Sequence, residues 1–537
     1  MDAIASVFQT IVDLGNAFLE WHVPATPVPW FVALLVGTGI YTTFRMGWIQ
    51  VHKFRHSIDV IRGKYDNPED EGDINHFQAL TTALSATVGI GNIAGVAIAI
   101  HFGGPGALFW MWVTAVFGMA LKYAECTLSM HHREFDEVGN AAGGPMYYIE
   151  RGMGKSWKWL AVAFAFCAII SSFGGGNMNQ ANTVAAAARS QLGAPEWLTG
   201  AVLVALVGAV ILGGIRRIGR VTAKLAPTMA ALYVFAAVVI LLENVGQLPG
   251  ILGDVFREAF NPSAGVGGVG AGVFSMTLLW GVKRGLFSNE AGQGSAPIAH
   301  AAAKTKEPVR EGIVAMIGPF IDTLVICSMT GFVILSAGVW NQKKQVEYEL
   351  GSVGVEIQAE GAVEFSDGTS DDVAFSANDG PMDETVVMVG GAPFSGRVAV
   401  TDGALDLPDG AMIHGRAFQT GQDLTAWAFE EGLGSIGGWI VTLCVFLFAL
   451  STAISWSYYG DRCVQYLFGH RWVTVYRVIY CVFLFIGANT ALTLVWAYGD
   501  LALGLMTIPN LIAILWLSGT VRKLTSDYLR REHRTYK

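Results

Sequence analysis

Long apolar runs alternate with short polar connections along this chain from residue 30 onward. Windows of about 20 apolar residues, the length that crosses a bilayer core, predict eleven membrane spans. The predicted spans are 30–50, 77–101, 105–130, 158–190, 197–214, 221–242, 268–303, 311–338, 436–460, 474–490 and 493–518. The pattern therefore predicts an all-α polytopic membrane protein.

Composition supports this prediction. Hydrophobic residues make up 53% of the 537 residues and charged residues only 14%, and the mean hydropathy is +0.45. Soluble proteins of this size carry more charge. The lipid bilayer is therefore an expected partner, whereas the sequence offers no basic face interleaved with aromatic residues and so indicates no nucleic-acid partner.

The distribution of lysine and arginine predicts the orientation in the membrane. Alternate connections hold 25 of the 34 basic residues, the other connections hold six, and three lie within spans. Cytoplasmic loops carry the excess of basic residues. With eleven spans, the N-terminus is expected outside and the basic tail, residues 519–537, in the cytoplasm. The expected location is a bacterial-type inner or plasma membrane.

Residues 1–29 form a separate segment before the first span. It has three acidic residues in its first 21 positions and no Lys or Arg, so it lacks the cationic region of a signal peptide. Ile4, Phe8, Ile11 and Phe18 recur at roughly helical spacing. We expect an extracytoplasmic amphipathic helix that lies at the membrane interface.

Residues 341–420 interrupt the apolar pattern between the eighth and ninth spans. They hold 14 acidic residues and one basic residue between Val346 and His414. Alternating polar and apolar residues at 353–358 and 396–401, with Asp-Gly turn signals around them, predict a small β-rich extracytoplasmic insert. It is either a solvated decoration or a cap that binds a partner or attracts cations. The other predicted domains are spans 1–8 in residues 30–340, and an outer loop helix with spans 9–11 in residues 421–518.

Two near-adjacent glycines interrupt the second predicted span. The segment Thr87-Val-Gly-Ile-Gly-Asn92 places Gly89 and Gly91 where a membrane helix least tolerates them. An unwound turn at this depth persists only where protein, water or a ligand satisfies its backbone groups. Such a break offers free N–H groups to a carboxylate and free carbonyls to a cation, and it is typical of transporters.

A second glycine-rich segment, residues 274–297, lies five spans after the first. This spacing suggests two five-helix repeats of opposite orientation, spans 2–6 and 7–11. Lys283, Arg284 and Glu290 lie at membrane depth here, where ionisable groups are expected to be paired or hydrated. Glu290 follows Lys283 by two helical turns, so either a structural ion pair near the cytoplasmic end or a substrate contact is possible.

The fourth span gathers Asn177, Asn179, Gln180 and Asn182. Such clusters commonly form interhelical hydrogen bonds. The spacing of Phe173, Asn177 and Gln180 also allows one face that lines a pocket.

The ninth span sets Ser451, Thr452 and Ser455 on adjacent turns. Their hydroxyls are hard neutral oxygens of the kind that Na⁺ needs, although hydroxyls in membrane helices also bond back to their own helix. Trp456, next to them, is a candidate gate or an interface anchor.

Catalytic motifs do not emerge from the sequence. It has no zinc-protease, nucleophile-elbow or phosphate-loop signature. The six cysteines lie in or beside apolar segments without metal-ligand spacing, and we interpret them as packing residues. A transporter is therefore favoured over an enzyme, and broken helices in two related halves favour alternating access over a channel.

Several of these segments closely resemble the alanine/glycine:cation symporter family, the sodium:alanine symporters. The matching motifs are Thr87–Ala97, Gly103–Trp112, Gly281–Gly292 and Ser455–Gly460. The resemblance covers nearly the whole chain except residues 341–420. It implies a LeuT-type fold, a 5+5 inverted repeat with one extra N-terminal helix, and Na⁺-coupled uptake of L-alanine, glycine and other small neutral amino acids.

The resemblance also implies roles for individual residues. The residues implied for the substrate carboxylate are Gly89, Ile90 and Gly91, through their amides. Those implied for the co-transported Na⁺ are Ser85 and Val88, through nearby carbonyls, together with Thr452 and Ser455. Phe274, Met276 and Thr277 would bound the amine and side chain, and Phe173 and Trp456 would cap a small pocket that Gln180 also lines.

Two alternatives remain open at this point. The symporter could couple to H⁺ through Glu290 or Glu125, or the chain could be an amino-acid sensor whose signalling part is the insert. Deleting residues 341–420 discriminates between the transporter and the sensor, because uptake should survive if the insert is a decoration, whereas a sensor should lose its response.

Overall fold

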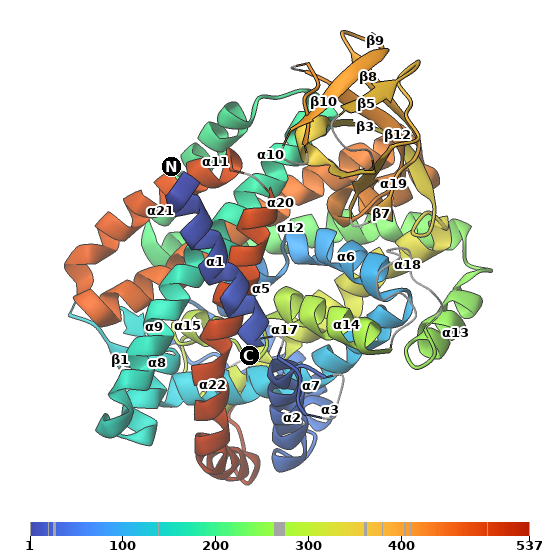
Figure 1. Cartoon of the computed structure of the whole chain (residues 1–537). Helices are drawn as coiled ribbons and strands as arrows, with labels where there is room; N and C mark the ends of the chain where they lie inside the picture. Colours follow the sequence, from blue (N-terminus) through green and yellow to red (C-terminus); the bar gives the residue numbers. More distant parts are fainter. Residues whose placement is uncertain are drawn as a thin grey trace.

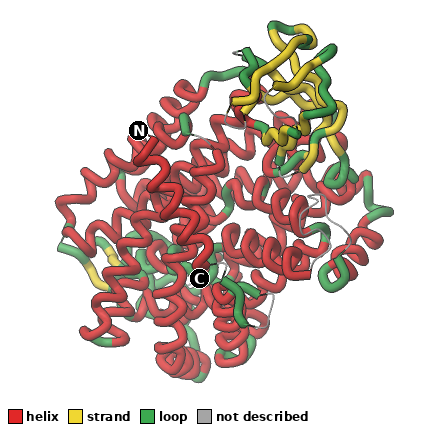
Figure 2. The backbone as a smooth tube through the Cα atoms, in the orientation of Figure 1, coloured by secondary structure: helices red, strands yellow, loops and turns green. Residues whose placement is uncertain are grey.

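Helices make up most of the molecule, and nearly all the strands gather at one corner (Figures 1 and 2). The structure is a computed structural model. It describes residues 2–19, 21–24, 28–137, 139–262, 274–358, 362–378, 380–401, 404–408, 410–490 and 492–535.

Seven helical segments of the described chain are long and apolar enough to cross a membrane, and one bent helix pair makes an eighth. The seven are Gly106–His131, Lys155–Leu192, Gly214–Glu243, Pro308–Ala337, Ser435–Phe468, His470–Ala488 and Tyr498–Leu529. The bent pair is His76–Thr87 with Ile90–Gly103. The chain is therefore a multi-pass membrane protein, as the apolar pattern predicts.

Three predicted spans are not among these segments. Helices α2 (Trp30–Arg45), α11 (Glu196–Ile211) and α14 (Phe274–Asn289) each have 16 residues. This is below the 20 or so residues that usually cross a bilayer. Residues 268–273 of the predicted seventh span lie outside the described residues, so the count of eleven spans stays a prediction.

The predicted break in the second span is confirmed. Helix α5 (His76–Thr87) begins with a capping box, in which Asn75 Oδ1 accepts the Gln78 N–H at 2.8 Å and Gln78 Oε1 accepts the Asn75 N–H at 3.1 Å. The helix ends at Thr87, a short turn η1 (Ile90–Asn92) follows, and α6 (Ala94–Gly103) continues. The two halves are bent by 62°.

A second break interrupts the glycine-rich segment. Helix α14 ends at Asn289 and α15 (Ala296–His300) follows it. Between them Glu290, Gly292 and Gly294 have positive φ angles of 53°, 79° and 84°. Only glycine adopts these angles without strain, so the two glycines allow the chain to turn here.

The N-terminal helix α1 (Asp2–Leu19) forms as predicted, but it also packs against the last helix, α22 (Leu492–Leu529). Val12 and Leu19 are buried with Leu501 of α22. Phe18 is largely exposed, and the side chains of Ile4, Phe8 and Ile11 lie outside the described residues.

The remaining helices and short helical turns complete the helical part of the molecule. They are α3 (Ile49–His52), α4 (Phe54–Ile61), α7 (Gly106–His131), α8 (Pro145–Tyr148), η2 (Ile149–Met153), η3 (Lys155–Trp157), α9 (Lys158–Phe173), η4 (Gly174–Met178), α10 (Asn179–Leu192), α12 (Gly214–Glu243), α13 (Leu248–Glu258), α16 (Pro308–Ala315), α17 (Ile317–Pro319), η5 (Phe320–Cys327), α18 (Ser328–Ala337), α19 (Gly421–Leu433), α20 (Ser435–Phe468), η7 (His470–Trp472) and α21 (Val473–Ala488). Turns η2, η4 and η5 are π-helical, a geometry that is frequent at functional sites.

Residues 343–418 fold into β structure with its own core. The strands are β3 (Lys343–Glu349), β4 (Gly354–Ile357), β5 (Ala362–Phe365), β6 (Val373–Ala377), β7 (Gly380–Pro381), β8 (Asp383–Val389), β9 (Ala392–Pro393), β10 (Gly396–Thr401), β11 (Ala404–Leu405) and β12 (Met412–Phe418), with one short turn η6 (Leu350–Ser352). They form sheets ordered β3-β12-β8-β9, β11-β10-β5 and β4-β6-β7. A separate pair, β1 (Glu134–Phe135) and β2 (Ala141–Ala142), lies elsewhere in the chain. Val363, Phe365, Val387 and Ile413 are buried in the insert's own core.

Candidate functional site

The first break lies against α20 and α10. Gly89 has extended backbone, and a Cβ atom there would lie 2.6 Å from Thr452 Oγ1 and 3.5 Å from Gln180 Oε1. The backbone of the break thus touches two polar side chains from two other helices, and a larger residue than glycine would collide with Thr452. The structure brings these three predicted site residues together.

Several buried side-chain oxygens on α5, α10 and α20 have no hydrogen-bond partner among the described residues. They are Ser85 Oγ, Thr452 Oγ1, Ser455 Oγ and Gln180 Oε1. A buried polar atom without a partner is costly, so water, an ion or a ligand is expected to satisfy these oxygens. Ser451 Oγ donates to the Ser85 carbonyl at 3.1 Å, which joins α20 to α5 at this level.

Polar side chains form hydrogen bonds with the backbone groups of the first break. The Gly89 N–H donates to Asn92 Oδ1 at 2.9 Å. Thr330 Oγ1 donates to the Asn92 carbonyl at 2.7 Å, and Thr425 Oγ1 donates to the Ile93 carbonyl at 3.0 Å. The predicted use of the Gly89 amide for a carboxylate stays a prediction; in this structure Asn92 Oδ1 accepts that N–H.

A buried carboxylate, Asp322 in turn η5, faces the same break. Asn92 Nδ2 donates to Asp322 Oδ1 at 2.7 Å. Ser288 Oγ and Thr323 Oγ1 donate to Asp322 Oδ2 at 2.7 and 2.8 Å. Asp322 thus links the first break, the end of α14 and the eighth span, and it places a titratable group at membrane depth. The sequence reasoning missed it, although a lone acidic residue inside an apolar run is a functional signal.

Helix α14 runs along α6 in the opposite direction. At one end, a Cβ atom at Gly91 would lie 3.1 Å from Phe287 Cδ1. At the other end, Thr277 Oγ1 donates to the Gly103 carbonyl at 2.8 Å. The ten residues of α6 span about 15 Å between these points, at a rise of about 1.5 Å per residue.

This direction separates Phe274, Met276 and Thr277 from the first break. Thr277 meets the far end of α6, and the Phe274 ring lies 5.8 Å from that of Trp110. Met276 is half-buried one residue before Thr277. The side chain that covers Gly91 is Phe287 instead, which the sequence reasoning did not single out.

The second break is tied to Trp456. Trp456 Nε1 donates to Glu290 Oε1 at 2.9 Å, and Ser295 Oγ donates to Glu290 Oε2 at 2.5 Å. Lys122 Nζ donates to the Glu290 carbonyl at 3.1 Å. Trp456 is buried and its ring lies against Gly176 of η4, so it is not an interface anchor.

Glu290 does not form the ion pair with Lys283 that their spacing allows. Lys283 Nζ lies 3.7 Å from Asp500 Oδ2 on α22, and a guanidinium nitrogen of Arg284 lies 2.9 Å from the same oxygen. Glu290 lies beyond the end of α14, where the chain has turned away from the helix. Its carboxylate therefore points to Trp456 rather than back along α14.

The polar residues of the fourth predicted span make two kinds of contact. Asn177 Nδ2 donates to the Tyr480 carbonyl at 2.8 Å and Asn182 Nδ2 donates to the Gly487 carbonyl at 3.2 Å, both on α21. Gln180 Nε2 donates to the Gly175 carbonyl at 2.9 Å, which leaves its Oε1 beside Gly89. The cluster thus makes interhelical hydrogen bonds and also contributes one residue to the site.

Phe173 packs away from this group. Its ring centroid lies 5.5, 6.0 and 4.7 Å from those of Tyr476, Tyr480 and Phe483 on α21. This packing gives no support to a joint cap formed by Phe173 and Trp456.

A model of the family described as the sodium:alanine symporter family matches residues 12–363 and 398–537. The chain belongs to this family. The resemblance inferred from the four motifs is confirmed, and the unmatched residues 364–397 lie within the insert. As a member of the sodium:alanine symporter family, the chain is an amino-acid:cation symporter and not an enzyme.

Individual relatives agree with this membership. The sodium/alanine symporter AgcS of Methanococcus maripaludis is 42% identical over 523 residues, which cover 97% of each chain. YrbD of Bacillus subtilis, provisionally named a sodium/proton-dependent alanine carrier protein, is 32% identical over 513 residues, which cover 95% of this chain and 90% of the relative. Among solved structures, MhsT in complex with L-phenylalanine is similar, with a TM-score of 0.47 and 12% identity over 83% of this chain and 99% of that chain.

Proposed function

We propose that this member of the sodium:alanine symporter family couples Na⁺ entry to the uptake of small neutral amino acids, alanine and glycine, by alternating access. The observation that supports the proposal is the pair of buried, unpartnered oxygens of Thr452 and Gln180 beside Gly89, together with those of Ser85 on α5 and Ser455 on α20, within the described part of the chain. A cation and a zwitterion together would satisfy these oxygens and the backbone of the break.

The substrate carboxylate binds at the start of η1. Asn92 takes the Gly89 N–H, so the amides of Ile90 and Gly91 are those assigned to the carboxylate. The positive end of the downstream half-helix favours an anion at the same point. Gln180 Oε1 is an acceptor that suits the ammonium group.

The pocket is small because its walls are close. Phe287 covers Gly91 and Thr452 covers Gly89, both within contact distance of a methyl group placed on these glycines. Adding a methylene to a well-packed site costs about 1–3 kcal/mol. Alanine and glycine are therefore favoured over larger neutral amino acids.

Neutral oxygens hold Na⁺. The hydroxyls of Ser85, Thr452 and Ser455, with the Val88 carbonyl, are the ligands assigned here, and Na⁺ suits such hard oxygen donors. The Asp322 carboxylate, bonded to Asn92 and Ser288, offers a second position with a formal negative charge. Na⁺ bound at either position stabilises the break together with the substrate.

The architecture assigned to this cycle is a LeuT-type 5+5 inverted repeat. The first repeat begins with the broken span α5–α6 and the second with the broken span α14–α15, five predicted spans later. The N-terminus and the insert lie outside, and the basic tail lies in the cytoplasm. One repeat-derived bundle then moves against the other around the site at the two breaks.

The coupling energy is sufficient. One Na⁺ that crosses about 100 mV supplies roughly 2.3 kcal/mol. A tenfold Na⁺ gradient adds about 1.4 kcal/mol. Together these allow accumulation on the order of several hundredfold for a zwitterion that carries no net charge.

Proton coupling is the second candidate, and one contact favours it. Glu290 is buried in the second break and accepts the Trp456 indole N–H at 2.9 Å, so its protonation would alter the contact between this break and α20. Glu125, buried beside Lys122, is the other candidate acid.

Calorimetric binding of alanine to the purified protein tests the proposal. We expect alanine to bind in NaCl and not in choline chloride, with glycine competing and phenylalanine failing to compete. Binding that is equal in both salts but strengthens as the pH falls would contradict Na⁺ coupling and support Glu290 or Glu125.

A further inference from the structure

A basic cavity lies between the segment that follows α2 and the end of α22, outside the site described above. Its volume is about 460 Å³. The cations among its described lining residues are Lys53, Arg55 and Arg531, and the carboxylate is that of Asp59. Imidazole and phenol rings line the rest of it. The cavity therefore has a positive lining.

Packing brings two basic segments of the chain together here. Five basic residues and one acidic residue lie from Arg45 to Lys64, and six basic and two acidic residues lie from Arg522 to Lys537. Helices α2 and α3 lie beside the lower part of α22 (Figure 1). His56 Nε2 in α4 and the Tyr528 hydroxyl in α22 are joined by a hydrogen bond of 2.8 Å.

Two of the charged groups that line the cavity are already paired. An Arg531 guanidinium nitrogen lies 2.9 Å from Glu307 Oε2. Lys64 Nζ lies 3.1 Å from Asp59 Oδ2. The one lining carboxylate therefore already has a cation outside the lining, and Arg531 has its own carboxylate.

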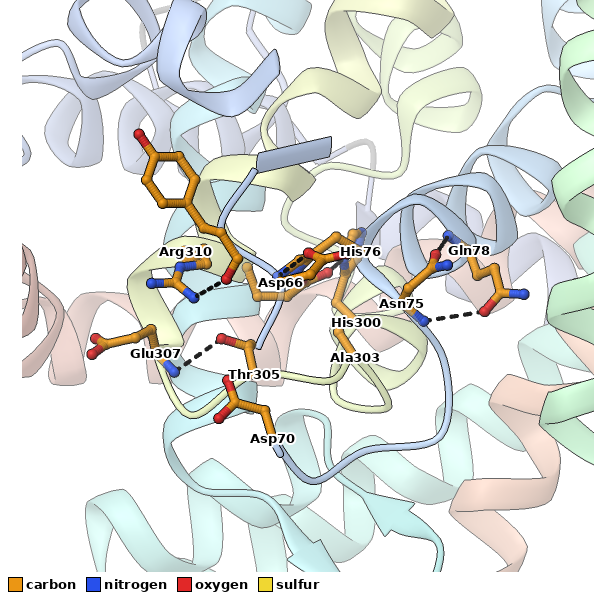
Figure 3. Close-up of polar contacts among 12 residues, drawn as sticks. Asp66, Asp70, Asn75, His76, Gln78, His300, Ala303, Thr305, Glu307 and Arg310 are labelled. Carbon is orange, nitrogen blue, oxygen red and sulfur yellow. Dashed lines mark hydrogen bonds and ion pairs between the residues drawn. The ribbon is translucent and has the colours of Figure 1, made fainter. Parts of the chain in front are cut away.

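Lys53 and Arg55 have no such carboxylate. Neither forms an ion pair within the described part of the chain. Arg310, drawn in Figure 3, adds a further cation next to the lining residue Tyr65, because its Nη1 donates to the Tyr65 carbonyl at 2.9 Å. The cavity thus has an excess of positive charge, and the ligand that complements it is an anion.

The histidine in this cavity agrees with such a surplus. Burial, with the nearby charges of His533, Lys53 and Arg310, lowers the pKa of His56 to about 4. The His56 ring is therefore neutral at pH 7. The charged contacts for an anion come from Lys53 and Arg55.

Exposed apolar side chains continue from the cavity towards the first predicted span. Phe44 at the end of α2 and Val51 in α3 are 63% and 62% exposed, and Trp48 between them is 37% exposed. The ring centroids of Phe44 and Trp48 lie 5.5 Å apart. Exposed apolar groups at the end of a span face lipid, and tryptophan is enriched at the level of the headgroups. The cavity therefore lies at headgroup level.

A phospholipid with a net negative charge fits both surfaces. Basic pockets between membrane helices bind anionic headgroups. A zwitterionic lipid brings its own ammonium group, which would meet Lys53 and Arg55 with the same sign of charge. A free phosphate ion would leave the neighbouring apolar surface unused.

We propose that this cavity binds the phosphate group of an anionic phospholipid, with Lys53 and Arg55 as the charged contacts and the acyl chains along Phe44, Trp48 and Val51. The bound lipid links the segment after the first predicted span to the end of α22 and stabilises their packing. The site depends neither on the transported amino acid nor on the coupled ion.

Native mass spectrometry of the delipidated, purified protein tests the site. We expect phosphatidylglycerol to bind the wild type more tightly than phosphatidylcholine does. In K53Q/R55Q the affinity for phosphatidylglycerol should fall about 25-fold, because each basic residue near an anionic headgroup contributes about fivefold. Phosphatidylcholine binding should not change. R55Q alone, at an exposed position, should lose about fivefold, and it serves if the double variant does not fold.

R217Q/R471Q is the matched control. Both arginines are exposed, lie in basic connections on the same predicted side and do not line the cavity. The control removes the same net charge and should keep the wild-type affinity for phosphatidylglycerol. Equal affinity of the wild type for both lipids, or an equal loss in the control, would overturn the proposal.

Thermal unfolding in detergent separates a lipid from a free anion and needs no transport. Phosphatidylglycerol should raise the melting temperature of the wild type and of R217Q/R471Q but not that of K53Q/R55Q. Inorganic phosphate at millimolar concentration should have little effect on any of them. If phosphate stabilises the wild type as much as phosphatidylglycerol does, and not K53Q/R55Q, the cavity binds a free phosphate and the lipid assignment is overturned.

Discussion

Thr452 takes part both in the contact with the first break and in the proposed set of cation ligands. Its hydroxyl lies against Gly89, where a Cβ atom would approach Oγ1 to 2.6 Å, and it is buried without a partner in the described chain. Ser455 follows one turn later on α20, and Ser451 holds α20 to α5 through the Ser85 carbonyl. The geometry therefore presents the neutral Thr452 oxygen to the break from α20, a helix that is hydrogen-bonded to α5.

Removing the Thr452 hydroxyl tests the assigned cation ligand. T452V keeps the side-chain volume but deletes one oxygen, so we expect the Na⁺ concentration for half-maximal uptake to rise about tenfold, as for loss of one contact to a charged group. T442V is a matched control, because the Thr442 hydroxyl bonds back to the Gly438 carbonyl at 3.0 Å on the same helix. An unchanged Na⁺ dependence in T452V would rule out this ligand.

Substitution of Gly89 tests the close approach of the first break to α20. G89A places a methyl group against Thr452 Oγ1, and we expect uptake to fall to background while the protein still folds. G95A is the control in the same broken span, since its Cβ would meet only Arg284 Cδ at 3.8 Å, an ordinary contact. Uptake by purified, reconstituted variants is the measurement. Wild-type activity in G89A would remove this contact from the site.

At the scale of elements, the sequence predicts the breaks better than the side chains around them. The glycine pair at Gly89 and Gly91 marks the first break, because glycines at bilayer depth conflict with the apolar pattern. The residues that meet across the second break depend on the direction of α14 relative to α6, which no local pattern encodes. For this reason Thr277 meets the end of α6 that is away from the first break, and Phe287, ten residues later, lies beside Gly91.

The sequence also does not predict which side chains pair between helices that are distant along the chain. Spacing along one helix suggests that Glu290 reaches Lys283, but Asp500 of α22 takes Lys283 and Arg284. Asp322 and the pair His76 and Glu311 likewise acquire their partners only through packing of distant helices. Each was visible only as an ionisable residue in or beside an apolar run.

The positive φ angles of the second break predict a stability cost for side chains there. G294A places a Cβ atom 2.5 Å from Pro145 Cγ at a φ of 84°, and we expect destabilisation of about 1–3 kcal/mol. G253A in α13, where a Cβ atom meets no heavy atom within 4 Å, should be neutral or slightly stabilising. Thermal unfolding in detergent compares the two. Equal melting temperatures would contradict the strained turn.

At the scale of the whole molecule, the β insert sits on the helices through a few polar contacts. Lys344 Nζ lies 3.1 Å from Glu430 Oε2 of α19, and an Arg189 amine lies 2.9 Å from Glu349 Oε1. The Asn378 carbonyl lies 3.1 Å from His101 Nε2 in α6. The insert has its own hydrophobic core.

Excising the insert distinguishes a transporter from a sensor. Lys343 of β3 lies opposite Phe418 of β12 in the antiparallel ladder, so Gln342 and Gln419 can be joined by a two-residue Gly-Ser link. We expect Na⁺-dependent alanine uptake by the excised protein to stay within about threefold of the wild type. Uptake abolished in a protein that still folds, with alanine binding retained, would favour a signalling role for residues 343–418.

Radiolabelled alanine uptake into proteoliposomes tests the central claim most directly. An inward Na⁺ gradient with an inside-negative potential should drive alanine above its external concentration, and replacing Na⁺ with K⁺ should abolish the accumulation. Imposing a pH gradient without Na⁺ should give no accumulation. Accumulation driven by the pH gradient alone would contradict Na⁺ coupling and transfer the role of the coupled ion to a proton.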